Sequence, residues 1–118
     1  MAVKEINSKE YWDYRFETDW KERGGEQQSS FFSDIAIEAM PEWMKKVLSD
    51  NHLSFCDWGC ALGDGTSVLK SSLGIANIVG VDISSSGIDI ARSKYPGIEF
   101  IAGDFLEMLP SRQFDVLF

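Results

Sequence analysis

The second half of the sequence alternates apolar segments with helix-like segments, and this alternation constrains the fold more than any other feature. Four segments have the length and apolar character of buried strands, namely residues 53–58, 75–81, 98–102 and 114–118. Gly74 and Pro96 end the helical intervals that separate the first three strands. Strands and helices that alternate at this spacing form a parallel sheet with right-handed crossovers. The sequence therefore predicts an α/β fold in which helices cover both faces of a parallel sheet, cut off after about four strands.

Residues 1–52 predict helices that precede this sheet. Asn7 with Glu10 three residues later resembles a capping box, which predicts a helix start followed by an aromatic-rich helix to Trp20. Apolar residues at helical spacing then predict one buried face of a second helix, formed by Phe32, Ile35, Ala36, Ala39 and Met40. We therefore expect two units: an N-terminal helical lid segment over residues 1–52 and a sheet domain over residues 53–118.

Charge and composition exclude several classes of function. The net charge is -8, from 11 basic and 19 acidic residues, so a polyanion such as nucleic acid is not the expected partner. No apolar run reaches the roughly 20 residues of a membrane helix, and residues 1–5 have no apolar leader. We therefore expect a cytoplasmic protein that does not enter a membrane. Cys56 and Cys60, with His52 as the only histidine, have neither redox nor zinc spacing, so no metal site is expected.

A glycine-rich segment joins the first predicted strand to its helix. It reads D-W-G-C-A-L-G-D-G-T from residue 57 to residue 66, and glycine lets the backbone approach a ligand closely beside the free N–H groups of a helix start. The order G-x-x-x-G-x-G differs from the dinucleotide fingerprint G-x-G-x-x-G. Asp57 stands where a diphosphate would lie and would repel it. The segment therefore favours a ligand with an ammonium group and no phosphate.

Two more acidic residues follow the next two predicted strands. Asp82 comes 17 residues after Gly65, at a position where a carboxylate can accept two hydrogen bonds from a ribose diol. Asp104 follows the third strand. Because ligands of open parallel sheets bind beyond the carboxyl ends of the strands, we expect Asp57, Asp82 and Asp104 to line one crevice.

These motifs together resemble the class I methyltransferases, a Rossmann-like family with a seven-stranded sheet that uses S-adenosylmethionine. The glycine segment is similar to the family's D-x-G-C-G-x-G-x-G-T, V-G-V-D-I-S to its second motif, and the Gly103 turn to its third. The resemblance implies that the glycine loop packs against the methionine part of the cofactor through Gly59, Cys60, Ala61 and Gly63. Ala61 replaces a common glycine, which is tolerable unless the position needs a positive φ.

The resemblance also implies roles for the acidic residues. Asp57 would serve the amino group of the cofactor, and Asp82, followed by Ile83, would hold the ribose hydroxyls. Asp104 would meet the adenine amino group, and the backbone N–H of Phe105 would meet the adenine ring.

Residues 11–16, Y-W-D-Y-R-F, resemble the leading helix of many small-molecule methyltransferases. The resemblance implies that Arg15 meets the cofactor carboxylate and that Tyr11 or Trp12 covers the cofactor. The alternative is an aromatic helix that packs on the sheet and leaves Arg15 in solvent.

The function that follows is methyl transfer from S-adenosylmethionine to an unidentified acceptor, for which a small molecule is the expectation. No residue can be assigned as catalytic, because in this family the acceptor is bound mostly by segments after the fourth strand. Two alternatives stay open: half of an NAD-dependent oxidoreductase, and a non-catalytic cofactor-binding or assembly module. The resemblance implies the strand order 3-2-1-4, which leaves the fourth strand at an edge, so we expect these 118 residues alone to self-associate through that edge. We also expect them to be inactive, because the segments that bind the acceptor are absent.

Overall fold

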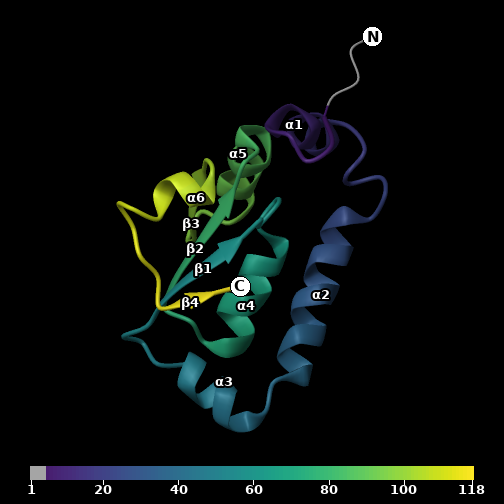
Figure 1. The fold of residues 1–118 in the computed structure, drawn as a ribbon. Helices are drawn as coiled ribbons and strands as arrows, with labels where there is room; N and C mark the ends of the chain where they lie inside the picture. The colour runs from purple at the N-terminus through teal and green to yellow at the C-terminus, as the bar shows by residue number, and fades with distance from the viewer. Residues whose placement is uncertain (1–4) are drawn as a thin grey trace.

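Four parallel strands form one sheet in the order β3-β2-β1-β4, as expected. The structure is a computed structural model that describes residues 5–118 (Figure 1). The expectation about an apolar leader concerns residues 1–5, of which the first four lie outside the described residues. The strands are β1 Ser54–Trp58, β2 Asn77–Asp82, β3 Glu99–Ala102 and β4 Val116–Leu117. In the register, Cys56 of β1 lies opposite Val79 of β2 on one side and Leu117 of β4 on the other.

Helices cover both faces of the sheet, which confirms the α/β prediction. Helices α4 Asp64–Leu73 and α5 Ser85–Lys94 lie on one face, and the short α6 Phe105–Met108 lies on the other. Alternation along the strands sends neighbouring side chains to opposite faces. Phe55 packs against α4 in one apolar cluster, whereas its neighbour Cys56 packs with Phe105 of α6 in another.

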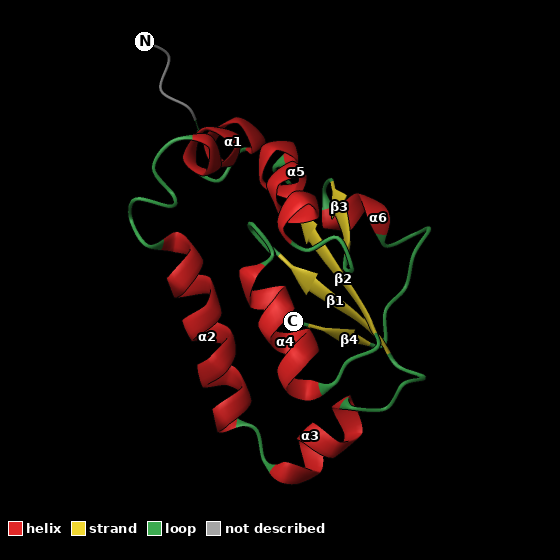
Figure 2. Cartoon of the chain, turned by 180° about the vertical axis from the view of Figure 1, so that it is seen from behind, coloured by secondary structure: helices red, strands yellow, loops and turns green. Residues whose placement is uncertain are grey.

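Three helices precede the sheet, namely α1 Lys9–Glu17, α2 Gly25–Ala39 and α3 Glu42–Leu48. Figure 2 shows α2 running along the outer side of α4, with α1 beside the start of α5. The chain thus passes first across one end of the sheet domain and then down its α4 side. Helix α1 therefore lies at the end of the sheet domain where the strands finish, whereas Leu48 of α3 packs into the core cluster of Phe55, Leu73 and Ile75.

The predicted start of α1 is wrong by one residue. Ser8, and not Asn7, caps the helix: its hydroxyl accepts a hydrogen bond from the Tyr11 N–H at 3.1 Å. Asn7 has a φ of 69°, in the left-handed region, where asparagine is better tolerated than most residues. The chain therefore uses Asn7 to turn and Ser8 to cap, and Glu10 takes no part in a capping box.

The predicted buried face of α2 is also wrong in part. Phe32 and Ile35 are 60% and 45% exposed. The side that meets α4 carries small polar residues instead, because α4 approaches very closely there: a Cβ on Gly65 would lie 2.7 Å from the Ser33 Oγ. Nearer the C-terminal end of α2, Ile37 packs against the core cluster that contains Leu69 and Leu73 of α4. Close helix packing through small side chains produces no apolar period, so periodicity placed part of the buried face wrongly, although Met40 packs against the core as predicted.

Within residues 5–118, none of the helices combines the length and the apolar character needed to cross a lipid bilayer. Cys56 and Cys60 are buried free thiols, as expected for reduced cysteines beside a core strand.

Candidate functional site

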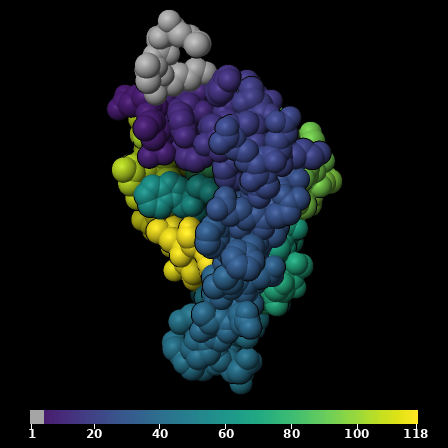
Figure 3. All heavy atoms as spheres, turned by 90° about the vertical axis from the view of Figure 1, so that its right-hand side faces the viewer, coloured from purple at the N-terminus to yellow at the C-terminus, as the bar shows by residue number. Residues whose placement is uncertain are grey.

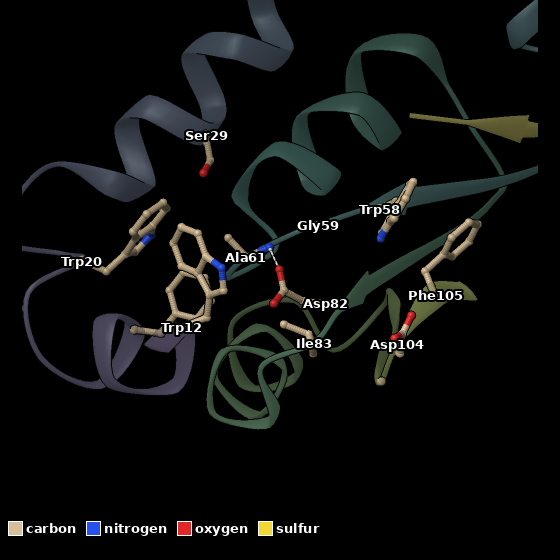
Figure 4. A pocket seen from close by; sticks show the side chains of 12 residues that line it. Trp12, Trp20, Ser29, Trp58, Gly59, Ala61, Asp82, Ile83, Asp104 and Phe105 are labelled. Atoms are coloured by element: carbon tan, nitrogen blue, oxygen red, sulfur yellow. Dashed lines mark hydrogen bonds between the residues drawn. The ribbon is translucent and has the colours of Figure 1, made fainter. Parts of the chain in front are cut away.

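A cavity of about 400 Å³ opens at the carboxyl ends of the strands, where ligands of parallel sheets bind. The sheet domain lines it with Trp58, Gly59, Ala61, Asp82, Ile83, Gly103, Asp104 and Phe105 (Figure 4). The N-terminal segment lines it with Trp12, Phe16, Trp20 and Ser29. In Figure 3 this segment forms a continuous purple-to-blue layer over one side of the molecule. The cavity therefore lies between the sheet edge and an aromatic lid.

The glycine turn after β1 is held against the end of β2. The backbone N–H groups of Gly59 and Cys60 both donate to the Val81 carbonyl, at 2.7 and 3.0 Å. Ala61 has a φ of 50°, so the position does adopt the left-handed conformation that glycine tolerates better. In that conformation the Ala61 N–H donates to the Asp82 carboxylate at 2.9 Å. The turn therefore presents backbone to the cavity and is anchored by Asp82.

Asp82 is the central polar side chain of the cavity. It is 7% exposed, and its second carboxylate oxygen accepts the Ser84 N–H at 3.0 Å. Burial raises the pKa of the Asp82 carboxyl, and the two backbone hydrogen bonds offset this only in part. Each carboxylate oxygen can accept more than one hydrogen bond. Asp82 can therefore anchor the turn and still accept hydrogen bonds from a ligand.

Asp104, Phe105 and Ile83 also line the cavity. The Asp104 side chain accepts the Leu106 N–H at 2.9 Å and caps α6. Phe105 stacks on Trp58 with ring centroids 4.7 Å apart, and Trp58 is 53% exposed. This end of the cavity therefore combines a carboxylate with aromatic and aliphatic surface, which suits a planar heterocycle.

Asp57 and Cys60 do not line the cavity. The Asp57 carboxylate accepts a hydrogen bond from the Thr66 hydroxyl at 2.6 Å, and burial raises its pKa. Cys60 is buried beside Gly80, and burial raises the pKa of its thiol. The contacts observed for both residues hold the turn to the sheet and to α4. Their predicted contacts with a cofactor stay predictions.

Gly63 also lies off the cavity. It precedes α4 with a φ of 84°, and a Cβ there would lie 2.6 Å from the Phe100 ring. The glycine therefore makes room for a core side chain, whereas the resemblance predicts room for the cofactor.

The aromatic lid is built by α1 and the turn after it. Phe16 stacks with Trp12 and meets Trp20 edge-on, with ring centroids 5.5 and 5.0 Å away. Arg15 points elsewhere: its Nε donates to Asp19 at 2.7 Å and its Nη1 to the Tyr11 hydroxyl at 3.2 Å. Neither Arg15 nor Tyr11 lines the cavity, whereas Trp12 does. In this arrangement Arg15 pairs with the Asp19 carboxylate, and its predicted contact with the cofactor carboxylate stays a prediction.

Hydrogen bonds to Asp13 tie the lid to the turn that follows Asp82. The Asp13 carboxylate accepts the Ser84 hydroxyl at 2.6 Å and the Ser86 N–H at 3.2 Å. Burial alone would raise the pKa of Asp13, but the hydrogen bonds from Lys9, Ser84 and Ser86 outweigh it and lower the pKa to about 2. Asp13 is therefore ionised at neutral pH, and α1 is held to the turn that follows Asp82.

Five lining residues were not predicted as site residues: Phe16, Trp20, Ser29, Trp58 and Gly103. Trp58 lies inside the glycine motif, so its position could have been proposed. No sequence pattern indicates Ser29 as a site residue, because its position depends on how α2 packs against α4. Among residues 5–118, no group of three or more histidine, cysteine or carboxylate side chains could hold a metal ion.

Comparison with known proteins identifies the family. Residues 55–118, more than half of the chain, match the family model described as a methyltransferase domain. The ubiquinone/menaquinone biosynthesis C-methyltransferase UbiE of Campylobacter jejuni is 36% identical over 101 residues, covering 75% of this chain and 40% of that protein. A trans-aconitate 2-methyltransferase of Azoarcus sp. is 29% identical over 93 residues, covering 79% of this chain and 37% of that protein.

Solved structures agree on the fold. The plantazolicin methyltransferase BpumL in complex with SAH superposes with a TM-score of 0.60 at 19% identity, covering 92% of this chain and 45% of that one. The chain thus spans less than half the length of these similar proteins. With the matched motifs, the parallel sheet order and the cavity at the strand ends, the chain belongs to the methyltransferase-domain family, within the class I methyltransferases that depend on S-adenosylmethionine.

Proposed function

We propose that the chain binds S-adenosylmethionine in the cavity and contributes the cofactor-binding part of a methyltransferase. The observation that carries this proposal is the placement of Asp82. Two backbone N–H groups hold its carboxylate at the cavity wall, where remaining acceptor positions face a ligand. A ribose diol offers the two donors that such a carboxylate can bind.

The other lining residues fit the rest of the cofactor. A volume of about 400 Å³ falls within the range of small-molecule sites. Asp104 and the Phe105 N–H would hold the adenine beside Trp58 and Ile83. Gly59 and Ala61 would pass their backbone beside the ribose and the sulfur.

The bound cofactor would supply a methyl group already activated by its sulfonium. The residues of the cavity therefore have to hold the cofactor and shield it from water, and they do not have to activate its methyl group. Asp82 and Asp104 would fix the orientation of the nucleoside, and Trp12 and Phe16 would keep water from one side of it. No described side chain is proposed as a catalytic base.

We propose a small organic molecule as the acceptor. The names of the trans-aconitate and ubiquinone/menaquinone methyltransferases support this class. The net charge of -8 disfavours nucleic acid, and we propose a cytoplasmic location. The acceptor and the atom that receives the methyl group stay unassigned. A non-catalytic binding module stays the second candidate, and methyl transfer by the full-length protein to one small-molecule acceptor would exclude it.

Isothermal titration with S-adenosylhomocysteine and, separately, with NAD tests the proposal. We expect saturable binding of S-adenosylhomocysteine near one molecule per chain and no heat from NAD, because Asp57 and the glycine order oppose a diphosphate. Binding of NAD as tight as that of S-adenosylhomocysteine would reject the proposal.

We further propose that the chain self-associates through the open edge of β4. This strand pairs only with β1 in the described sheet, and Leu117 is 52% exposed. An open apolar strand edge favours pairing with another chain. Sedimentation velocity at several protein concentrations should show a mass that rises with concentration. A monomer at every concentration would contradict this.

A further inference from the structure

We propose that Asp13 is a positioning residue that couples α1 to Asp82 and thereby sets how fast a ligand enters and leaves the cavity. The inference rests on the proposed function, because the ligand concerned is the one that Asp82 holds. Asp13 itself does not line the cavity. It acts through its contacts with the turn between Asp82 and α5.

The Asp13 carboxylate holds this turn by two hydrogen bonds. One of its oxygens accepts both the Ser84 hydroxyl at 2.6 Å and the Ser86 N–H at 3.2 Å. Ser84 is fully buried, and its hydroxyl also accepts the Gly87 N–H at 3.0 Å as the N-cap of α5. The partner of Asp13 is therefore fixed in place. Helix α1 cannot leave α5 without breaking hydrogen bonds to a charged acceptor, which are stronger than neutral ones.

Ser84 connects Asp13 to the carboxylate that faces the ligand. The Ser84 N–H donates to Asp82 at 3.0 Å, while the Ser84 hydroxyl donates to Asp13. Burial raises the pKa of the Asp82 carboxyl, and the nearby charge of Asp13 adds to this increase. The two carboxylates are thus joined through one residue, so a movement of α1 away from the turn changes the surroundings of Asp82.

The same helix supplies part of the aromatic lid. Trp12 and Phe16 of α1 both line the cavity. A Cβ on Gly87 would lie 2.7 Å from the Phe16 ring, so this ring lies directly against the start of α5. The Glu17 carboxylate accepts the Ser86 hydroxyl at 2.5 Å, which adds a polar contact at the same place. Release of α1 from α5 would therefore withdraw Trp12 and Phe16 and open the cavity.

Helix α2 is held by other contacts. Glu26 of α2 pairs with Lys94 of α5 at 3.2 Å, and the close approach to α4 at Gly65 lies further along α2. Figure 2 shows α1 beside α5 and α2 along α4. Because these contacts do not involve α1, the release of α1 is a local opening that leaves α2 in place.

Stopped-flow kinetics with Asp13→Ala test the inference on two ligands. S-Adenosylhomocysteine carries an amino acid, whereas 5′-methylthioadenosine keeps the adenosine and the sulfur and lacks it. We expect both to dissociate about 10-fold faster or more, because the lost hydrogen bonds to a charged acceptor no longer keep α1 closed. Association should also become faster, because entry no longer waits for α1 to open. Unchanged dissociation, or faster dissociation without faster association, would overturn the inference.

A double-mutant cycle with Ser84→Ala tests the route. This change should speed dissociation from the unmodified protein and have little further effect on Asp13→Ala, because both changes break the same contact. The lost N-cap of α5 is present in both backgrounds and cancels. An equal effect of Ser84→Ala in the two backgrounds would overturn the inference. Lys9→Ala is the matched control: it removes the exposed ion pair of Asp13, leaves both contacts with the turn, and should change the rates little.

Hydrogen exchange gives a second measurement that needs no ligand. In the ligand-free protein, the amides of α1 should exchange faster in Asp13→Ala, whereas those of α2 and α4 should keep their rates. Faster exchange in all three helices would show a general loss of stability and would overturn the inference. Absence of S-adenosylhomocysteine binding to the unmodified protein would instead reject the proposed function, whatever the exchange rates.

Discussion

Asp82→Ala should weaken binding of S-adenosylhomocysteine about 10- to 150-fold, the largest loss of affinity expected for any single side chain of the cavity. Hydrogen bonds to a charged acceptor contribute about 1.5–3 kcal/mol, which corresponds to that range. The carboxylate also anchors Ala61 and Ser84, so part of the loss will come from a looser glycine turn. Calorimetric titration measures the loss, and circular dichroism checks that the fold persists.

A second ligand pair isolates the direct contact. Unmodified protein should prefer 5′-methylthioadenosine over its 2′-deoxy analogue, and this preference should disappear in Asp82→Ala. A loosened turn would weaken both ligands alike and leave the preference in place. Asp89→Ala is the matched control, because Asp89 is an exposed aspartate of α5 outside the cavity. Equal affinity of Asp82→Ala and the unmodified protein would reject the ribose assignment.

Gly63→Ala should cost about 2–5 kcal/mol of unfolding free energy, the largest stability effect that we expect. Two costs add: a left-handed conformation costs a non-glycine residue about 1–2 kcal/mol, and forcing a methyl group into a filled core costs about 1–3 kcal/mol. The φ of Gly63 is 84°, and the new Cβ would lie 2.6 Å from the Phe100 ring. Urea denaturation followed by circular dichroism measures the change.

Two other glycines separate these costs. Gly59 and Gly74 have φ values of 77° and 66°, with nothing within 4 Å of a Cβ. Alanine at either position should therefore cost only the conformational part, about 1–2 kcal/mol. Gly59 also lines the cavity and Gly74 does not, so only Gly59→Ala should additionally reduce ligand affinity. Equal destabilisation in all three variants would show that the contact with Phe100 contributes nothing.

The contrast between Gly63 and Asp82 shows how far motif matching extends. Both residues match the family pattern, and from the pattern both are expected to meet the cofactor. Asp82 lines the cavity, whereas Gly63 lies against Phe100, a residue 37 positions later in the chain. A motif records which residue types occur at a position, but it does not separate a glycine needed for a ligand from one needed for a core side chain.

The sequence by itself determined the parallel sheet and the edge at which the cavity opens, and the resemblance to the family supplied the strand order. These follow from local patterns and general rules: apolar strands alternate with helices, crossovers are right-handed, and the carboxyl ends of parallel strands meet at one edge. Asp82 and Asp104 were therefore placed correctly at that edge. Asp57 lies at the same edge, but its carboxylate bonds to Thr66 and not to the cavity.

Only the tertiary structure decided how the lid meets the sheet. The inward face of α2 and the place of Ser29 depend on close contact between helices far apart in the chain, made through small side chains such as Gly65. The positive φ of Ala61 arises because the turn closes onto Val81 and Asp82. Such contacts depend on the shapes of surfaces that exist only after folding, so neither periodicity nor motif spacing encodes them.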